Sequence, residues 1–143
     1  MDMGLKTLNI ILKHWSRMLA DVTERAPYEA CGLVAGNNNE STAVFEIPNV
    51  LNSPVRFRMS PEEQLRAFNL IDQNGWEISA IYHSHPEGPE TPSKSDIAEF
   101  AYPGVIYLIW SRIDGEWRCR GFHIAEGGYE EIDLCIHERE HRI

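Results

Sequence analysis

The sequence predicts an α/β fold in which a mixed β-sheet is flanked by helices, and three observations support this prediction. In the first two-thirds of the chain, segments whose apolar residues recur every three or four positions alternate with short strand-like segments. The last third contains consecutive segments with the pattern of strands. The 143 residues are too few for two comfortable cores. We therefore expect one domain over residues 1–143, with a polar tail at residues 137–143.

The first part of the chain carries a helical pattern and then a hairpin. Apolar side chains lie at helical spacing over residues 5–25, although residues 5–12 are apolar enough to form a short strand instead. Pro27 ends this element. The hairpin is expected to consist of a buried strand at residues 30–35, a turn at residues 36–39 and a return strand at residues 42–47.

Helices and strands alternate again beyond an irregular crossing at residues 49–58. Ser60 is the expected N-cap of a helix that starts with Pro61 and ends at Asn74 and Gly75. A loop rich in proline and glycine leads to a short helix from Ser93 to about Ala101. The remaining expected strands lie at residues 76–82, 105–110, 117–124 and 129–136.

The composition limits the partners and the compartment. With 22 acidic and 13 basic residues the net charge is −9, which is unfavourable for binding nucleic acid or an anionic membrane surface. No segment reaches the roughly 18 apolar residues that cross a bilayer. The three cysteines are widely spaced and form no CxxC pair, which is typical of a reducing compartment. We expect a cytoplasmic protein that binds neither nucleic acid nor membranes.

Two histidines at the end of a predicted strand are the most informative feature. His83 and His85 are two residues apart, so both side chains lie on one face of the strand. Pro86 ends the strand, and Asp96 follows in the first turn of the next helix. Two neutral imidazoles and one carboxylate form the ligand set of an open catalytic zinc site, in which the metal makes a bound water acidic. The sequence predicts one zinc ion at these three residues.

A simpler interpretation exists for each part of this pattern. An isolated His-x-His is usually coincidence, and Ser93 with Asp96 is also a good helix N-terminus. Capping, however, leaves the two histidines at the strand end unexplained. Glu29, directly before the apolar strand, is the candidate proton acceptor, because burial at a strand edge raises the pKa of a carboxyl group. The alternative for Glu29 is a solvated loop residue.

The segments from Tyr28 to Gly36, from His83 to Pro86 and from Ser93 to Asp96 together resemble the JAMM (MPN+) metallopeptidase family, in its short prokaryotic type. The signature of that family is a glutamate, a His-x-His-Pro sequence and a Ser-x-x-Asp sequence, with seven residues between the second histidine and the serine; each position is filled here. The crossing that begins at Asn49 also resembles short members of the family. The similarity extends over residues 5–124.

The resemblance implies a role for each of these residues. His83, His85 and Asp96 would bind zinc, Glu29 would act as general base and then general acid, and Ser93 would help to stabilise the oxyanion. The implied fold is a curved mixed sheet similar to that of cytidine deaminases. The implied reaction is hydrolysis of a peptide or isopeptide bond after the C-terminus of a ubiquitin-like or sulfur-carrier protein. The oligomeric state stays open, with a homodimer as one alternative.

Three other functions are disfavoured. Non-catalytic MPN-type modules that bind a ubiquitin-like partner lack one or more ligands, whereas this sequence has all of them. A RadC-like DNA-associated protein normally has a helical DNA-binding region upstream, which is missing here. The net charge of −9 is also unfavourable for association with DNA. A deaminase combines His-x-Glu with a Pro-Cys-x-x-Cys sequence, and that combination is absent here.

Two further motifs are expected to have no catalytic role. Residues 137–141 match the H-E-x-x-H zinc motif, but a third downstream ligand is missing and a chain end frays, so we interpret the match as a polar tail. Cys31 follows Glu29 closely, but no partner pattern supports a nucleophile, and we expect a buried structural thiol.

Overall fold

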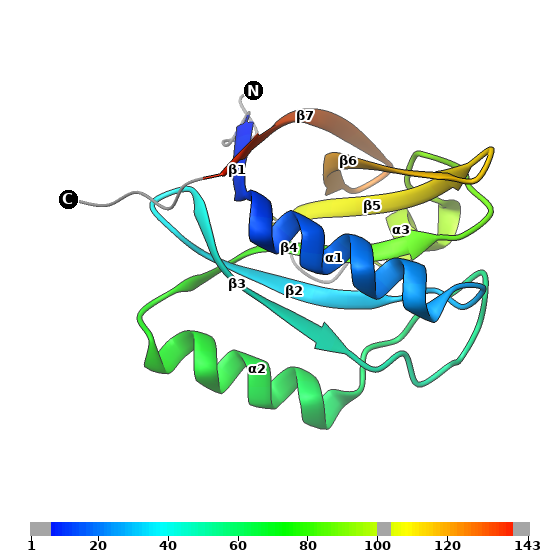
Figure 1. The fold of residues 1–143 in the computed structure, drawn as a ribbon. Helices are drawn as coiled ribbons and strands as arrows, with labels where there is room; N and C mark the ends of the chain where they lie inside the picture. The colour runs from blue at the N-terminus through cyan, green and yellow to red at the C-terminus, as the bar shows by residue number, and fades with distance from the viewer. Residues whose placement is uncertain (1–6, 100–103, 139–143) are drawn as a thin grey trace.

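A computed structural model of the protein describes residues 7–99 and 104–138. Within these residues the chain has the predicted α/β architecture, with one strongly curved sheet and helices packed against it (Figure 1). The elements, in chain order, are β1 (Thr7–Ile11), α1 (Leu12–Arg25), β2 (Cys31–Asn37), β3 (Glu40–Ile47), α2 (Pro61–Gln73), β4 (Glu77–His85), α3 (Lys94–Glu99), β5 (Ile106–Ile113), β6 (Glu116–Ala125) and β7 (Gly128–His137).

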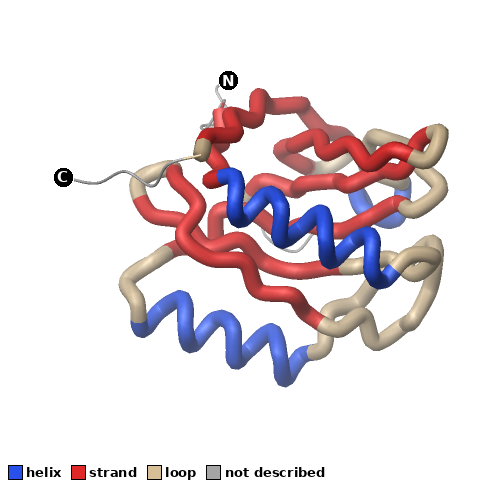
Figure 2. The backbone as a smooth tube through the Cα atoms, in the orientation of Figure 1, coloured by secondary structure: helices blue, strands red, loops and turns tan. Residues whose placement is uncertain are grey.

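The sheet is mixed and curves until it closes (Figure 2). The strand order is β1-β3-β2-β4-β5-β6-β7. β4 and β5 are parallel, whereas β2 is antiparallel to both of its neighbours. β1 closes the sheet because it runs parallel to β7 along its whole length and meets β3 at one pair, Asn9 with Glu40. The strands β2, β4 and β5 are therefore consecutive neighbours in the middle of the sheet.

Helices cover both faces of the sheet. Apolar residues of α1 pack with Val34 and Tyr82 in one buried cluster, and apolar residues of α2 pack with Leu33 and Ile81 in the other. Neighbouring residues enter different clusters because side chains alternate between the two faces of a strand. His83 and His85 follow Ile81 at intervals of two, so they lie on the face that α2 covers.

The N-terminal segment contains both of the alternatives that its sequence allowed. Thr7–Ile11 forms β1, and α1 begins directly afterwards at Leu12. Of the two alternatives left open for residues 5–12, the strand is therefore the one found at Thr7–Ile11, and the helical spacing holds from Leu12. Residues 7–11 form a strand rather than a helix because they pair with β7. This pairing buries Leu8 and Ile10 and gives every residue of β1 a partner. Residues 5 and 6 lie outside the described residues.

The later elements follow the sequence closely. Ser60 caps α2 by accepting a hydrogen bond from the backbone N–H of Glu63 at 3.3 Å, as predicted. The helix after Ser93 is present, but its predicted end at about Ala101 lies outside the described residues. The predicted polar tail begins one residue too early, because β7 includes His137, which pairs with Ile11. Residues 139–143 also lie outside the described residues.

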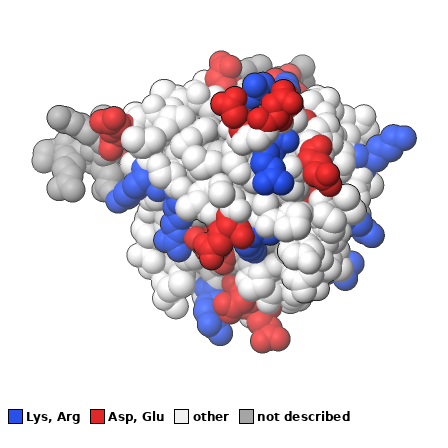
Figure 3. All heavy atoms as spheres, turned by 45° about the vertical axis from the view of Figure 1, so that its right-hand side comes forward, with Lys and Arg blue, Asp and Glu red and all other residues white. Residues whose placement is uncertain are grey.

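Charged side chains of both signs lie on the surface of the protein. On the face that Figure 3 shows, acidic and basic side chains lie interspersed among uncharged residues, and the basic ones form no continuous patch on that face. Among the helices of the described chain, none has the length and apolar character that crossing a membrane requires.

Candidate active site

The candidate site lies at one end of the three middle strands of the sheet, β2, β4 and β5. Cys31 of β2 pairs with His83 of β4, and the same antiparallel register carried two residues further puts Glu29 opposite His85. The strands stay together at this point, since the N–H of Ser84 donates to the carbonyl of Ala30 at 3.0 Å. On the other side of β4, His85 pairs with Ser111 of β5. Glu29, two residues before β2, therefore lies in a row with His85 of β4 and Ser111 of β5.

The three predicted metal ligands converge on one point. Nε2 of His83 and Nε2 of His85 lie 3.2 Å apart. Nε2 of His83 is 3.2 Å from Oδ1 of Asp96, and Nε2 of His85 is 3.1 Å from Oδ2. Both histidines are buried, and the Asp96 side chain is only 9% exposed. The loop between β4 and α3 thus brings the carboxylate back to the two imidazoles.

Ser93 and Asp96 form the helix cap that the simpler interpretation predicted. The Ser93 hydroxyl accepts from the N–H of Asp96 at 3.0 Å, and Oδ2 of Asp96 accepts from the N–H of Ser93 at 2.8 Å. The same carboxylate also faces both histidines. Capping and metal ligation are therefore compatible, because the cap fixes the direction in which the carboxylate points.

The two imidazoles are oriented by different contacts. Nδ1 of His85 lies 2.8 Å from the carbonyl oxygen of Pro89. Because a carbonyl only accepts, Nδ1 carries the proton and Nε2 of the neutral ring presents its lone pair to the site. His83 instead stacks on Phe57, with ring centroids 4.6 Å apart and an interplanar angle of 24°. Nδ1 of His83 has no hydrogen-bond partner among the described residues.

The pKa values of the three converging residues are shifted in different directions. Burial lowers the pKa of His83 below its ordinary value despite the nearby Asp96. Burial also opposes the charged form of His85, but hydrogen bonds to Asp96 and to the Pro89 carbonyl outweigh it and raise the pKa of His85. Burial alone would raise the pKa of Asp96; the two histidines and the Ser93 N–H hold it well below its usual range. Asp96 is therefore ionised near neutral pH.

This donor set fits a zinc ion. Zinc–nitrogen bonds of about 2.0–2.1 Å put two ligand atoms of a tetrahedral site about 3.3–3.4 Å apart. The observed separations of 3.1–3.2 Å between the ligand atoms are close to that value. The three residues each offer one ligand atom, and all these atoms lie within 4.8 Å of one another. Two nitrogens and one carboxylate oxygen are also the ligand types that zinc accepts in catalytic sites.

Glu29 is buried, not solvated, with an exposure of 3%. Its backbone N–H donates to the carbonyl of Ser53 at 2.8 Å, and its carbonyl accepts from the Asn49 side chain at 3.1 Å. Burial raises the pKa of the Glu29 carboxyl from 4.5 to about 8; the charge of His85 lowers it, and that of Asp96 raises it. The residue lies opposite His85 in the register of β2 with β4, and the pKa of its carboxyl group responds to the charges of His85 and Asp96.

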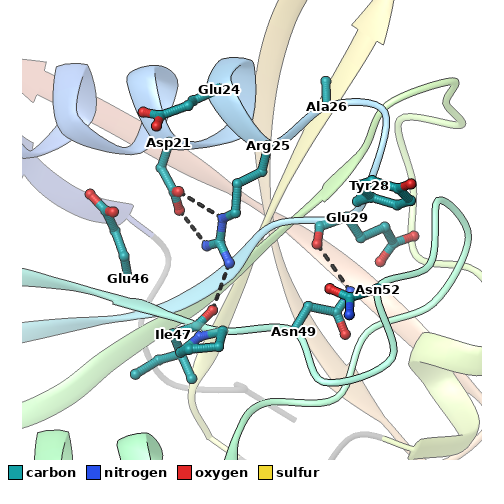
Figure 4. A pocket seen from close by; sticks show the side chains of 11 residues that line it. Asp21, Glu24, Arg25, Ala26, Tyr28, Glu29, Glu46, Ile47, Asn49 and Asn52 are labelled. Atoms are coloured by element: carbon teal, nitrogen blue, oxygen red, sulfur yellow. Dashed lines mark hydrogen bonds and ion pairs between the residues drawn. The ribbon is translucent and has the colours of Figure 1, made fainter.

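A cavity of about 640 Å³ is lined in part by Glu29. Its walls include Glu29 but none of the three converging residues, so it is a separate space. Figure 4 shows the Glu29 side chain pointing away from the ion pair between Asp21 and Arg25. That pair is a structural element: Arg25 also donates to the carbonyls of Cys31 and Ile47, which ties α1 to β2 and β3.

The two motifs expected to be non-catalytic show no catalytic arrangement among the described residues. His137 is the last residue of a strand rather than part of a helix, and its Nε2 lies 3.3 Å from a carboxylate oxygen of Glu40. His141, the other histidine of that motif, is outside the described residues. Burial raises the pKa of the Cys31 thiol to about 12, which makes it a buried structural thiol as predicted.

Sequence reasoning assigned no role to Phe57, Pro89 or Ser111. Phe57 belongs to the crossing that was included in the family resemblance, so its position beside His83 had a signal in the sequence. The carbonyl of Pro89 and the hydroxyl of Ser111 had none, because their contacts depend on the pairing of β4 with β5.

Comparison with known proteins identifies the family to which the sequence is similar. Residues 12–120 match the family model described as prokaryotic homologues of the JAB domain. A desampylase of Pyrococcus furiosus is 39% identical over 108 residues, covering 76% of both chains. A probable TtuB-protein conjugate cleaving protease of Thermus thermophilus is 37% identical over 118 residues, covering 82% of this chain and 74% of the relative. A CysO-cysteine peptidase of Mycobacterium tuberculosis is 29% identical over 125 residues, covering 85% and 86%.

Solved structures share the fold. The solution structure of a protein from Desulfitobacterium hafniense matches with a TM-score of 0.82 and 32% identity, covering 92% of this chain and 94% of that one. A JAB1/MPN domain protein from Archaeoglobus fulgidus matches with a TM-score of 0.60 and 20% identity, covering 92% and 100%, and this likeness concerns the fold alone. The predicted fold class and family are thereby confirmed. The chain belongs to the family of prokaryotic homologues of the JAB domain.

Proposed function

We propose that the protein is a zinc-dependent metallopeptidase that hydrolyses the bond after the C-terminus of a ubiquitin-like or sulfur-carrier protein. The observation that carries this proposal is the convergence of His83, His85 and Asp96 within 4.8 Å, next to the buried carboxyl group of Glu29. A structural metal site would need no such carboxyl group beside it, whereas hydrolysis needs a proton acceptor there.

Each side chain has a part in this proposal. His83, His85 and Asp96 would hold one zinc ion, which would supply Lewis-acid chemistry and lower the pKa of water towards about 7. Glu29 accepts a proton from the attacking water and then delivers it to the leaving amine, and its burial strengthens its affinity for a proton relative to an exposed carboxyl group. The Ser93 hydroxyl donates towards the negative charge that develops on the carbonyl oxygen.

The substrate class comes from the relatives. Their names describe a desampylase, a protease that cleaves TtuB-protein conjugates and a peptidase that acts on CysO-cysteine. We infer a small ubiquitin-like or sulfur-carrier protein as the substrate of this chain, without nucleic acid or membrane as a partner. Its three cysteines are free thiols, which agrees with a cytoplasmic enzyme. A homodimer stays among the possible assemblies.

The test combines metal analysis with substrate cleavage. The purified protein is stripped with a chelator, reloaded with one equivalent of zinc and incubated with two substrates. One is an isopeptide conjugate of a ubiquitin-like protein, and the other is a C-terminal cysteine adduct of a sulfur carrier. We expect cleavage directly after the carrier C-terminus, detected by mass spectrometry, only in the zinc-loaded sample.

Matched variants separate the site from general effects. Asp96→Asn should lose both zinc and turnover, while Asp72→Asn, at an exposed position of α2 outside the site, should keep both. A zinc-loaded protein that cleaves neither substrate would contradict the proposed reaction. Full activity of the metal-free protein would contradict the role of zinc.

A further inference from the structure

The loop between β4 and α3 is held by one carbonyl oxygen that accepts two hydrogen bonds. The carbonyl of Pro89 accepts from Nδ1 of His85 at 2.8 Å and from the hydroxyl of Ser111 at 2.8 Å. A carbonyl oxygen has two lone pairs, so both bonds form together and each fixes the oxygen against the other. Ser111 is thereby linked to His85 through an atom that belongs to neither residue.

We propose that Ser111 is a positioning residue that orients His85 for metal binding by anchoring the Pro89 carbonyl. The proposal rests on the assignment of His85 as a metal ligand in the proposed function. It adds a residue outside the sequence signature of the family and explains why a hydroxyl group lies buried at this place in β5.

The location of Ser111 supports this role. Ser111 is the partner of His85 in the parallel register of β4 and β5, and only 1% of it is exposed. Both residues lie on the same face of the sheet, directly beneath the loop. A buried hydroxyl group without a partner is unfavourable, so its hydrogen bond to the loop is strongly preferred over no bond.

The loop needs such an anchor. Pro89 itself is exposed, and residues 86–92 contain no helix or strand. Two further hydrogen bonds hold the start of the loop among the described residues: the N–H of Gly88 donates to the carbonyl of His85, and Nε of Arg112 donates to the Pro86 carbonyl at 3.2 Å. Ser111 is the donor that holds the loop at the point where it contacts the imidazole.

The consequence for the metal site is a fixed ring orientation. As long as the Pro89 carbonyl stays in place, the proton remains on Nδ1 of His85 and Nε2 faces His83 and Asp96. Without the Ser111 bond, the carbonyl can turn towards water and the ring can rotate or exchange its tautomer. Groups that orient a metal ligand in this way typically change metal affinity by about 10–100-fold when they are removed.

The first experiment measures zinc affinity by competition with a chromophoric chelator. For Ser111→Ala we expect an affinity about tenfold weaker than that of the wild-type protein. Ser111→Thr keeps the hydroxyl group and should restore the affinity to within about threefold. Ser41→Ala is the matched control, because it removes an equally buried hydroxyl, bonded to His14 and to the N–H of Ile11, far from the site. It should leave zinc affinity unchanged.

The second experiment does not depend on metal. In the metal-free protein with neutral His85, we expect nuclear magnetic resonance to show a protected Nδ1–H proton for His85. This signal should exchange faster with solvent, or move to the other tautomer, in Ser111→Ala but not in Ser41→Ala. Where Ser111→Ala fails to fold, Ser111→Cys takes its place, since a thiol is a weak donor of similar size.

The outcomes separate the two proposals. If the wild-type protein binds no zinc, the proposed function fails, and the His85 proton still decides whether Ser111 positions the ring. Unchanged zinc affinity and an unchanged Nδ1–H signal in Ser111→Ala would overturn the positioning role. Equal losses of zinc affinity in Ser41→Ala and Ser111→Ala would overturn it as well, because the effect would then be one of general stability.

Discussion

The side-chain amide of Asn49 donates a hydrogen bond of 3.1 Å to the carbonyl oxygen of Glu29. The same amide donates to Arg56 and accepts from the N–H groups of Leu51 and Arg58, so all of its partners are backbone atoms. Asn49 is buried, and it joins the start of β2 to the crossing at residues 49–58. The backbone of the proposed general base is thus held by a residue that does not touch the metal ligands.

Replacing this amide should affect turnover more than metal binding. Asn49→Asp removes both donors and places a carboxylate oxygen against two carbonyl oxygens. We expect the free energy of unfolding to fall by about 2–4 kcal/mol and kcat/KM to fall by more than about tenfold, with zinc affinity nearly unchanged. Urea unfolding, cleavage kinetics and chelator competition measure the three quantities. Asn74→Asp, at the exposed end of α2, should change none of them strongly. Unaltered kcat/KM in folded Asn49→Asp would contradict the prediction.

Glu29→Gln should separate metal binding from turnover. Because the amide has nearly the shape of the carboxyl group, the zinc ligands should stay intact. The amide accepts no proton, so the proposed base is lost. General acid–base catalysis contributes about 10²–10⁴-fold, and we expect kcat to fall by at least about 100-fold at full zinc occupancy. Zinc content is measured on the same sample as the cleavage rate. Turnover at the wild-type rate by this zinc-loaded variant would rule out Glu29 as the base.

The stability of the metal-free protein should depend on pH through Glu29. Its pKa is raised from 4.5 to about 8 on folding, so the folded state binds more protons than the unfolded state between these pH values. Stability therefore falls as pH rises through this window. Relative to Glu29→Gln, the wild-type protein should lose on the order of a few kcal/mol between pH 5 and pH 8. Urea unfolding of both chelator-treated proteins tests this; a constant difference between them would contradict it.

The three thiols should differ in reactivity. Cys31 is fully buried and burial raises its pKa to about 12, while Cys135 is exposed. Burial also raises the pKa of Cys119 well above its ordinary value. Because the thiolate is the reactive form, iodoacetamide should label Cys135 first in the folded protein, and peptide mapping identifies the site. Fast labelling of Cys31 without unfolding would show that the thiol is accessible, contrary to its assignment as structural.

Much of the fold follows from local pattern. The alternation and apolar runs of β2 to β7 and the Ser60-Pro61 start of α2 are visible in the sequence, because periodicity and capping act over a few residues. The start of the chain is different. Leu8 and Ile10 fit a helix or a strand equally well, and only pairing with β7, far away in the chain, decides for β1. The same pairing draws His137 into β7.

The candidate site also combines features that follow from the sequence with features that only the tertiary structure sets. The sequence by itself determined the ligand types, because His83 and His85 share a strand face through their spacing and the cap at Ser93 directs Asp96. Only the tertiary structure decided that Glu29 lies opposite His85 and that Ser111 lies on its other side, since both relationships are set by the register of β4 with β2 and β5. It also decided the pKa of Glu29, because burial by neighbouring elements sets the cost of ionising a carboxyl group.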